Sequence, residues 1–230
     1  MEKPLRPAEY AEYQLLEAIV EQEFKPGSVL PAERVLALTL GVTRPTLREA
    51  LQRLSTKGWI TISQGRQTRV SDYPSEGGLA LLGSMALHGK GLSPSMVENL
   101  LEVRVAILPG IARIAVEKAF QDLLEFLEKG PGHGGDPAAF AQYDWDLQLL
   151  MVTLTNNPVF RFIFNDFTSI FHGLGELYFQ EERARKSSLA FYEELILIIG
   201  KKVKGGDGVE ACVRRAMEKS LMIWKSKEKP

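Results

Sequence analysis

Hydrophobic positions follow two different patterns along this chain, and the change between them falls near residue 75. Up to residue 70 the apolar residues predict three short helices, over Ala8–Phe24, Pro31–Leu40 and Arg44–Lys57, followed by a β-hairpin. Beyond residue 78, long apolar stripes at helical spacing alternate with Gly, Pro and Asn. The pattern therefore predicts a mainly helical protein with a small β element in its first third.

The second and third short helices form a close pair with a turn between them. Pro31 starts the first helix and Gly41 ends it, and Thr43 can cap the second. The apolar residues expected to face a core are Val35, Leu36, Leu38 and Leu40 in the first helix and Leu47, Ala50, Leu51 and Leu54 in the second. Arg44, Arg48 and Gln52 lie on the opposite face of the second helix, which favours insertion into a DNA major groove.

A β-hairpin is predicted directly after this pair, from Trp59–Ile62 and Thr68–Val70 with a polar turn between them. From Thr43 to Arg69 six basic residues face one acid, Glu49, in a chain whose net charge is −1. A purely structural subdomain with solvated arginines is the alternative interpretation. The hairpin and the placement of the charge favour nucleic-acid binding.

The stretch LPAERVLALTLGVTRPTLREALQRLSTKGWITI resembles the winged-helix domain of the GntR family of bacterial transcription regulators. The resemblance covers residues 1–71 and implies DNA contacts by Arg34, Thr43, Arg44, Thr46, Arg48, Gln64, Gly65 and Arg66. Arginine can bind guanine through two hydrogen bonds, threonine can reach phosphate or a base edge, and glycine lets a wing approach closely.

Composition limits the classes of protein that need to be considered. At 230 residues with 45% hydrophobic and 25% charged residues, the chain has ordinary globular composition. A single cysteine, Cys212, excludes an intramolecular disulfide and is expected to be a small buried residue. No apolar run approaches the length of a membrane span, so we expect a cytoplasmic protein without membrane contact. Residues 1–71 carry +2 and the remainder −3, which points to nucleic acid for the first part only.

Residues 72–78 have the composition of a linker, and residues 79–230 are expected to form an all-helical, antiparallel bundle that binds an effector. The predicted helices are Leu79–Leu87, Pro94–Ala119 with a break at Pro109-Gly110, Gln121–Glu128, Pro137–Thr155, Pro158–Tyr178, Arg183–Ile199 and Val209–Lys225. Three of them begin at a cap residue followed by proline, as Ser93-Pro94, Asp136-Pro137 and Asn157-Pro158. The glycine-rich segment 130–135 lacks the lysine of a phosphate-binding loop and is interpreted as a plain loop.

Aromatic residues crowd the segment from Phe160 to Phe179. A fully buried helix and the wall of a lipid-binding tunnel would produce the same pattern, and the residues alone do not decide between them.

The stretches VENLLEVRVAI, FAQYDWDLQLLMVTLTNNPVF, SLAFYEELILI and VRRAMEKSLMIW are similar to the fatty-acid-responsive branch of the GntR family. That branch binds long-chain acyl-CoA in its helical domain. The resemblance implies ligand contacts by Arg104, Tyr192, Ser220 and Trp224. Arg214, Arg215, Lys219 and Lys225 lie nearby in the sequence and could bind phosphates, although a solvated basic face is the alternative.

The broader subfamily binds a metal through an aspartate and three histidines. Here Asp144 is present, but Gln148, Glu193 and Glu218 occupy the other positions, and His88, His133 and His172 lie elsewhere. We therefore expect no metal site and no cofactor.

Together these patterns predict a homodimeric transcription regulator that binds a pseudo-palindromic DNA operator, responds to a small-molecule effector and is not an enzyme. The effector is expected to be a long-chain acyl-CoA, with another small carboxylate or metabolite as the alternative. A helical acyl-CoA-binding enzyme is the rival from another class, and no catalytic grouping in the sequence supports it. Leu79–Leu87 is expected to link the effector domain to the DNA-binding domain.

Overall fold

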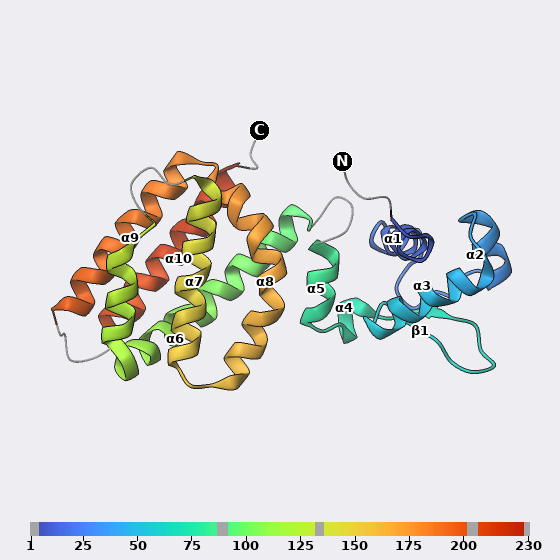
Figure 1. Cartoon of the computed structure of the whole chain (residues 1–230), viewed down its shortest axis with the longest axis horizontal. Coiled ribbons are helices and arrows are strands. Elements are labelled where there is room, and N and C mark those ends of the chain that lie inside the picture. Colours follow the sequence, from blue (N-terminus) through green and yellow to red (C-terminus); the bar gives the residue numbers. More distant parts are fainter. Residues whose placement is uncertain (1–4, 87–91, 132–135, 202–206, 228–230) are drawn as a thin grey trace. The chain divides into compact units, whose positions relative to one another are not determined.

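The computed structural model describes residues 5–86, 92–131, 136–201 and 207–227 (Figure 1). The apolar residues of the short N-terminal helices form one small core. The chain divides into two units, residues 1–91 and 92–230. In the first unit the helices are α1 (Pro7–Val20), α2 (Glu33–Thr39), α3 (Arg44–Thr56), α4 (Tyr73–Glu76) and α5 (Leu79–Ala86). Its two strands, β1 (Ile60–Thr61) and β2 (Arg69–Val70), pair antiparallel with Ile60 opposite Val70.

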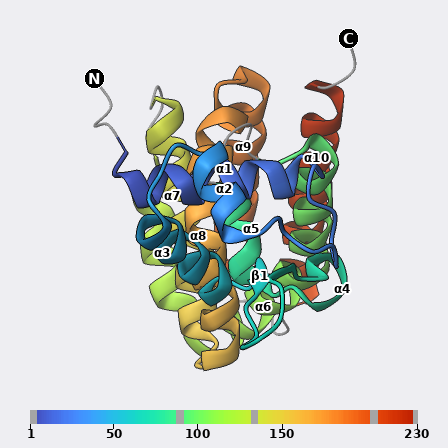
Figure 2. The same ribbon diagram turned by 90° about the vertical axis from the view of Figure 1, so that its right-hand side faces the viewer.

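Helices α1 and α3 pack against each other and the short α2 packs on α3 (Figure 2). The core between them combines buried residues of α1, α3 and the hairpin, namely Leu15, Leu16, Ile19, Leu47, Leu51, Leu54, Trp59, Ile60 and Val70. This arrangement confirms the predicted helix pair and hairpin.

Two apolar residues of α2 do not face this core, contrary to expectation. Val35 is 46% exposed and Leu38 is 82% exposed, whereas Leu36 and Ala37 are buried. Because α2 has only seven residues, it presents little more than one side of two turns to its neighbours. The prediction that all four apolar positions point inward was therefore wrong for Val35 and Leu38.

Helix α5 packs with the first unit, although the sequence predicted that it opens the second domain. Its Leu81 joins the core of the first unit, and Met85 packs against that core. The indole Nε1 of Trp59 donates a hydrogen bond of 2.8 Å to the Ser84 hydroxyl, which donates to the carbonyl of Leu81. A buried polar contact and an apolar one therefore hold α5 against the start of β1. Within the expected linker, residues Tyr73–Glu76 form the short helix α4.

The second unit contains α6 (Pro94–Lys129), α7 (Pro137–Leu154), α8 (Pro158–Phe179), α9 (Glu182–Gly200) and α10 (Asp207–Lys227). Each of α6, α7 and α8 starts at the predicted cap residue, whose side chain accepts a backbone N–H: Ser93 from Met96, Asp136 from Ala139 and Asn157 from Val159. The predicted break at Pro109-Gly110 was wrong, because α6 continues through both residues. Its non-helical residue is Ala119 (φ −152°, ψ 57°), where the sequence predicted one helix to end.

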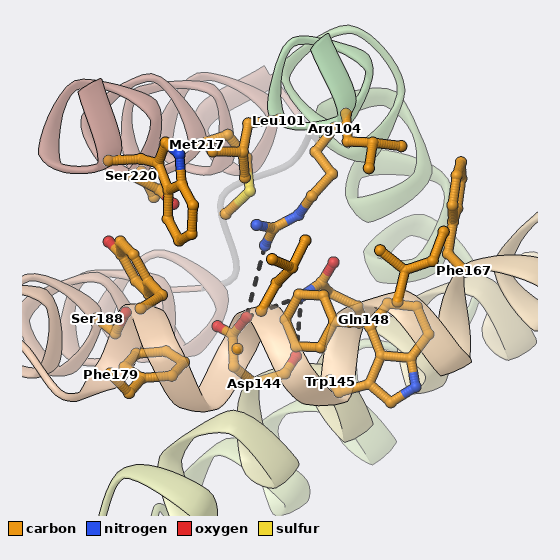
Figure 3. A pocket seen from close by; sticks show the side chains of 18 of the residues that line it. Leu101, Arg104, Asp144, Trp145, Gln148, Phe167, Phe179, Ser188, Met217 and Ser220 are labelled. Atoms are coloured by element: carbon orange, nitrogen blue, oxygen red, sulfur yellow. Dashed lines mark hydrogen bonds and ion pairs between the residues drawn. The ribbon is translucent and has the colours of Figure 1, made fainter. Parts of the chain in front are cut away.

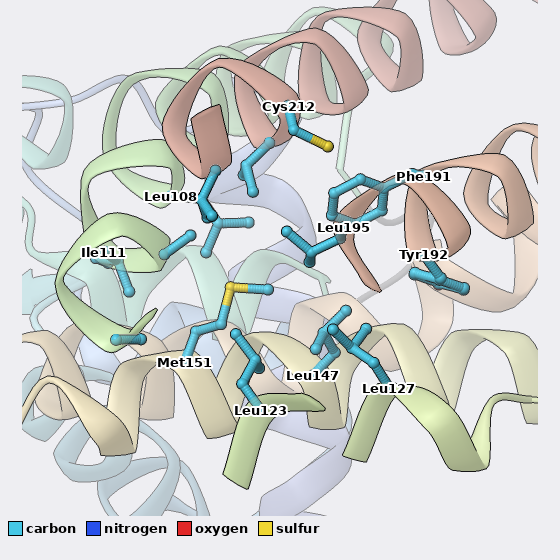
Figure 4. Packing of buried hydrophobic residues seen from close by; sticks show 14 of the residues in the cluster. Leu108, Ile111, Leu123, Leu127, Leu147, Met151, Phe191, Tyr192, Leu195 and Cys212 are labelled. Atoms are coloured by element: carbon cyan, nitrogen blue, oxygen red, sulfur yellow. The ribbon is translucent and has the colours of Figure 1, made fainter. Parts of the chain in front are cut away.

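The core of this unit lies where α6, α7, α9 and α10 meet (Figure 4). It includes Leu108 and Ile111 from α6, Leu147 and Met151 from α7, and Leu195 from α9. Cys212 is buried as expected, and burial raises the pKa of its thiol to about 12. Among the described residues, none of these helices combines the length and the hydropathy that crossing a membrane requires.

Candidate DNA-reading surface and ligand pocket

The start of α3 is fixed by a threonine cap. Thr43 Oγ1 accepts the backbone N–H of Thr46 at 3.3 Å and lies 2.8 Å from the Thr46 hydroxyl. Arg44 follows as the first helical residue and is exposed. Since both threonines already serve the helix start, their hydroxyls keep only part of their hydrogen-bonding capacity for a partner.

Of the other predicted DNA contacts, Arg48 is held by an ion pair and the rest lie open. The Nε of Arg48 donates to Glu33 Oε2 of α2 at 2.8 Å. Arg34, Gln64, Gly65 and Arg66 are exposed. Gly65, between β1 and β2, has a φ of 73°, a conformation that side chains with a Cβ rarely adopt. Glu33 therefore pairs with one arginine at the surface, while Arg34, Arg44 and Arg66 have no ion pair within the described parts of the chain.

Two basic residues at the C-terminal end of α3 pair with a glutamate of α1. Lys57 Nζ lies 2.5 Å from Glu12 Oε1, and Arg53 lies 3.6 Å from Glu12 and 2.6 Å from Glu49. Glu12 itself is buried. The positive charge that this segment has available for DNA is therefore smaller than the sequence count suggests, because Glu12 of α1 neutralises part of the charge of Arg53 and Lys57.

In the second unit, side chains from all five helices line a single pocket (Figure 3). Its wall is mostly aromatic and aliphatic and includes Leu101, Trp145, Phe164, Phe167, Phe171, Phe179, Phe191, Met217 and Trp224. The cavity has a volume of about 80 Å³, which is room for several water-sized groups but not for a whole acyl chain.

One carboxylate, that of Asp144 on α7, organises the polar side of this pocket (Figure 3). Tyr192 Oη donates to its Oδ1 at 2.9 Å, Gln148 Nε2 donates to its Oδ2 at 2.8 Å, and Arg104 Nη2 lies 3.5 Å from Oδ2. Burial raises the pKa of Asp144, while Arg104, Tyr192 and Gln148 oppose that rise. Three helices therefore supply partners to a carboxylate that is shielded from solvent.

Three of the four predicted ligand residues line the pocket. Arg104, Ser220 and Trp224 are part of its wall, and the guanidinium of Arg104 lies 5.2 Å from the centre of the Phe171 ring. Tyr192 is not part of the wall. It is buried in the core, where burial and the neighbouring Asp144 raise the pKa of its phenol well above the usual value.

From the sequence, Asp144 and Gln148 were considered only as positions at which the broader subfamily has metal ligands. Their spacing of four residues on a largely apolar helix is a signal that they share one face. Glu193 and Glu218, the other two positions of that set, are exposed, and the described residues contain no cluster of His, Cys, Asp or Glu suited to a metal. His88 and His133 lie outside the described residues, as does the side chain of His172.

Most of the cations predicted near the ligand are already paired at the surface. Arg214 pairs with Glu210 at 3.1 Å, Arg215 with Glu194 at 2.5 Å, and Lys225 with Glu98 at 3.4 Å and Glu102 at 3.3 Å. Of the four, only Lys219 has no ion pair with another described residue. A phosphate group would have to compete with carboxylates for the other three.

Comparison with known proteins also gives two parts, but places their boundary before α4 and not after α5. The model of the gntR family of bacterial regulatory proteins matches residues 7–70, and that of the FadR C-terminal domain matches residues 71–229. The fatty acid metabolism regulator protein of Serratia proteamaculans is 35% identical over 224 residues, which is 97% of this chain and 93% of that protein. The protein of the same name from Proteus mirabilis is 33% identical over 228 residues, 99% of this chain and 95% of its own length.

A solved structure described as Lar, which controls expression of the Listeria monocytogenes agr system, has a similar fold. Its TM-score is 0.60 at 15% identity, over 99% of this chain and 100% of that one. The match supports the fold alone. With a family model for each part and relatives over nearly its whole length, the chain belongs to the GntR family of bacterial transcription regulators and carries a FadR C-terminal domain.

Proposed function

We propose that this protein regulates genes of fatty-acid metabolism as a homodimer, and that long-chain acyl-CoA in its helical domain weakens its binding to operator DNA. The family is one of DNA-binding transcription regulators and not of enzymes. The aromatic pocket on which all five helices of the second unit converge carries the proposal of an acyl ligand. Binding to DNA implies that the protein works in the cytoplasm.

DNA reading is assigned to residues 1–71. Arg44 and Arg48 on α3 would enter the major groove, with Arg34 and Thr46 beside them, and Gln64, Gly65 and Arg66 would approach the backbone or minor groove. The exposure of Arg44 and Arg48 on the same helix supports these roles.

Dimerisation follows from the small reach of one recognition helix. A single helix-turn-helix contacts only a few base pairs, so useful affinity requires two copies on a pseudo-palindrome with half-sites about one helical turn apart. Light scattering of the free protein and of its operator complex tests this, and a monomer in both would overturn it.

Ligand binding would change the helical domain, because the pocket is too small for an acyl chain as it stands. Its about 80 Å³ would have to widen, so the filled and unfilled domains differ in structure. The first half of α6 contributes Val97, Leu101 and Arg104 to the wall, and α5 directly precedes α6 in the chain. We propose that α5, anchored on the DNA-binding unit through Ser84, carries this change to the recognition helix.

The proposal is tested by two titrations. Linkage requires that oleoyl-CoA weakens operator binding and that operator weakens oleoyl-CoA binding by the same factor. A factor of about 5–150, the usual range for coupled sites, is the expected result. If oleoyl-CoA binds tightly and neither constant changes, the pocket does not control DNA binding. If oleoyl-CoA does not bind, the acyl-CoA assignment fails.

A further inference from the structure

The pocket wall contains a polar notch, made by Gln148 and Arg104, which both reach Oδ2 of Asp144. Gln148 is 2% exposed. Its Nε2 donates to Asp144 Oδ2 at 2.8 Å and to the Asp144 backbone carbonyl at 3.2 Å. Both of these partners are oxygens that only accept, so the amide nitrogen faces Asp144 and the amide oxygen faces away.

That oxygen, Gln148 Oε1, is buried and has no hydrogen-bond partner among the described residues. Arg104 Nε is in the same condition: it is buried, and no described residue accepts its N–H. The guanidinium reaches Asp144 through Nη2 instead. Figure 3 shows both side chains approaching Asp144, Arg104 from α6 and Gln148 from α7, within the pocket lining. The notch therefore offers one unused acceptor and one unused donor, and the indole N–H groups of Trp145 and Trp224 in the same wall also lack a partner among the described residues.

A plain hydrocarbon chain is a poor partner for this notch. It would leave a buried N–H of a charged group and a buried amide oxygen without hydrogen-bond partners, whereas a polar group on the ligand would satisfy them. A carbonyl, a thioester or a carboxylate can accept from Arg104, but it has no proton to donate to Gln148. A hydroxyl group does both, since it has one O–H donor and two lone pairs.

We propose that the preferred ligand of this pocket is a fatty acyl chain that carries a hydroxyl group. Its oxygen accepts from Arg104 Nε, and its proton is donated to Gln148 Oε1. The inference rests on the proposed binding of an acyl ligand and specifies its chemical class. Leu101, Trp145 and Phe171 line the same pocket and offer apolar contacts to the hydrocarbon part of such a ligand.

The test measures binding of the full-length protein to palmitoyl-CoA and to a series of hydroxypalmitoyl-CoA isomers with the hydroxyl at carbon 2, 3, 10, 12 or 16. Isothermal titration calorimetry gives each dissociation constant. The expected result is that at least one isomer binds roughly 10- to 100-fold more tightly than palmitoyl-CoA, the range for a hydrogen bond that involves a charged group.

The variant Gln148→Met tests whether the notch causes the tighter binding of the hydroxylated ligand. Gln148→Met keeps the length of the side chain and removes the acceptor, so the favoured isomer should fall to within about threefold of palmitoyl-CoA, while palmitoyl-CoA itself binds at least as well as before. Gln142→Met is the matched control, because Gln142 lies on the same helix but is exposed and bonds Asp146. It should leave every constant unchanged.

Each remaining outcome is decisive. If palmitoyl-CoA binds and no isomer is more than about threefold tighter, a retained water molecule serves the notch; the hydroxyl proposal then fails while the acyl-CoA function stands. A preference that survives in Gln148→Met also overturns it. If no acyl-CoA binds, both proposals fail. The comparison among ligands needs only the unaltered protein, so it decides the matter even if Gln148→Met does not fold.

Discussion

Replacing Asp144 by leucine is expected to destabilise the helical unit, because three polar groups depend on its carboxylate. The change removes the acceptor of two hydrogen bonds, from Tyr192 at 2.9 Å and Gln148 at 2.8 Å, and the counter-charge of Arg104 at 3.5 Å. The side chains of Arg104 and Asp144 are only 17% and 9% exposed. Water therefore cannot readily replace the lost hydrogen bonds and the lost counter-charge.

The size of the loss in unfolding free energy depends on which groups remain without a partner. Breaking a buried ion pair from one side costs about 3–5 kcal/mol, because an uncompensated charge remains. Each stranded donor adds up to about 1–3 kcal/mol, although costs within one network do not add fully. We expect Asp144→Leu to lose at least about 3 kcal/mol of unfolding free energy, at the level of a broken buried pair.

The decisive comparison is with a variant that removes the whole network. Arg104→Met, Asp144→Leu, Gln148→Met and Tyr192→Phe together leave no stranded group, so this quadruple variant should unfold within about 2 kcal/mol of the unaltered protein. Urea titration followed by tryptophan fluorescence in a Trp59→Phe background reports on the second unit, since Trp145 and Trp224 lie there. A loss below about 1 kcal/mol for the single variant, less than even one typical stranded group, would refute the reasoning.

The same network predicts a pH dependence. Burial raises the pKa of Asp144 in the folded state, and Arg104 is the largest influence that lowers it. A carboxyl with a raised folded pKa is most favourable to stability below its unfolded pKa of about 3.9, and this contribution is lost as pH rises through the folded value. Arg104→Met raises that value further. Its destabilisation should be greatest at neutral pH and shrink as pH falls, as measured by urea titration at pH 7 and 5; an equal loss at both would contradict it.

Two predictions concern the first unit. Ser84→Ala leaves the buried indole N–H of Trp59 without its acceptor, and should cost about 1–3 kcal/mol in thermal or urea unfolding of that unit; an unchanged midpoint would mean that α5 is held by apolar contacts alone. Arg44→Ala should cost about 1–3 kcal/mol on the cognate operator and much less on random DNA by fluorescence anisotropy, whereas Arg53→Ala, whose charge faces Glu12, should change neither. Equal losses on both DNAs for Arg44→Ala would make it a phosphate contact.

The helices were predictable where local chemistry determines them. Ser93, Asp136 and Asn157 each cap the helix expected of them, because a cap depends on residues two or three positions away. The incorrect prediction for Leu38 concerns packing between elements, because its exposure depends on how little of α2 meets the core. The packing of α5 on the first unit, through the hydrogen bond from Trp59 to Ser84, is likewise a contact between residues far apart in the sequence. Neither feature leaves a local signal.

The aromatic segment 160–179 shows why one sequence could not separate a core from a tunnel. Phe164 is buried in the core and also borders the pocket, Phe167 and Phe171 line the pocket, and Phe162 is 66% exposed. All three environments occur on one helix, since a helix bordered by a core, a cavity and solvent can carry aromatic residues on each side. The segment therefore contributes both to the core and to the wall of the pocket, and lipid binding by that pocket stays a prediction.

The polar centre of the pocket was the least predictable feature, and it has the closest connection to function. The sequence places Asp144 and Gln148 on one face of a helix, but it does not show that Arg104 and Tyr192 arrive from two other helices to meet them. An apolar wall of the same volume would cost less to bury than this network, since buried ion pairs rarely stabilise relative to well-packed hydrophobic residues. Stability alone therefore does not account for an ion pair, an unused amide oxygen and an unused guanidinium N–H in the wall of this pocket. Under the proposed function, recognition of a polar group on the ligand would account for them, because such a group supplies the hydrogen bonds that the protein leaves open.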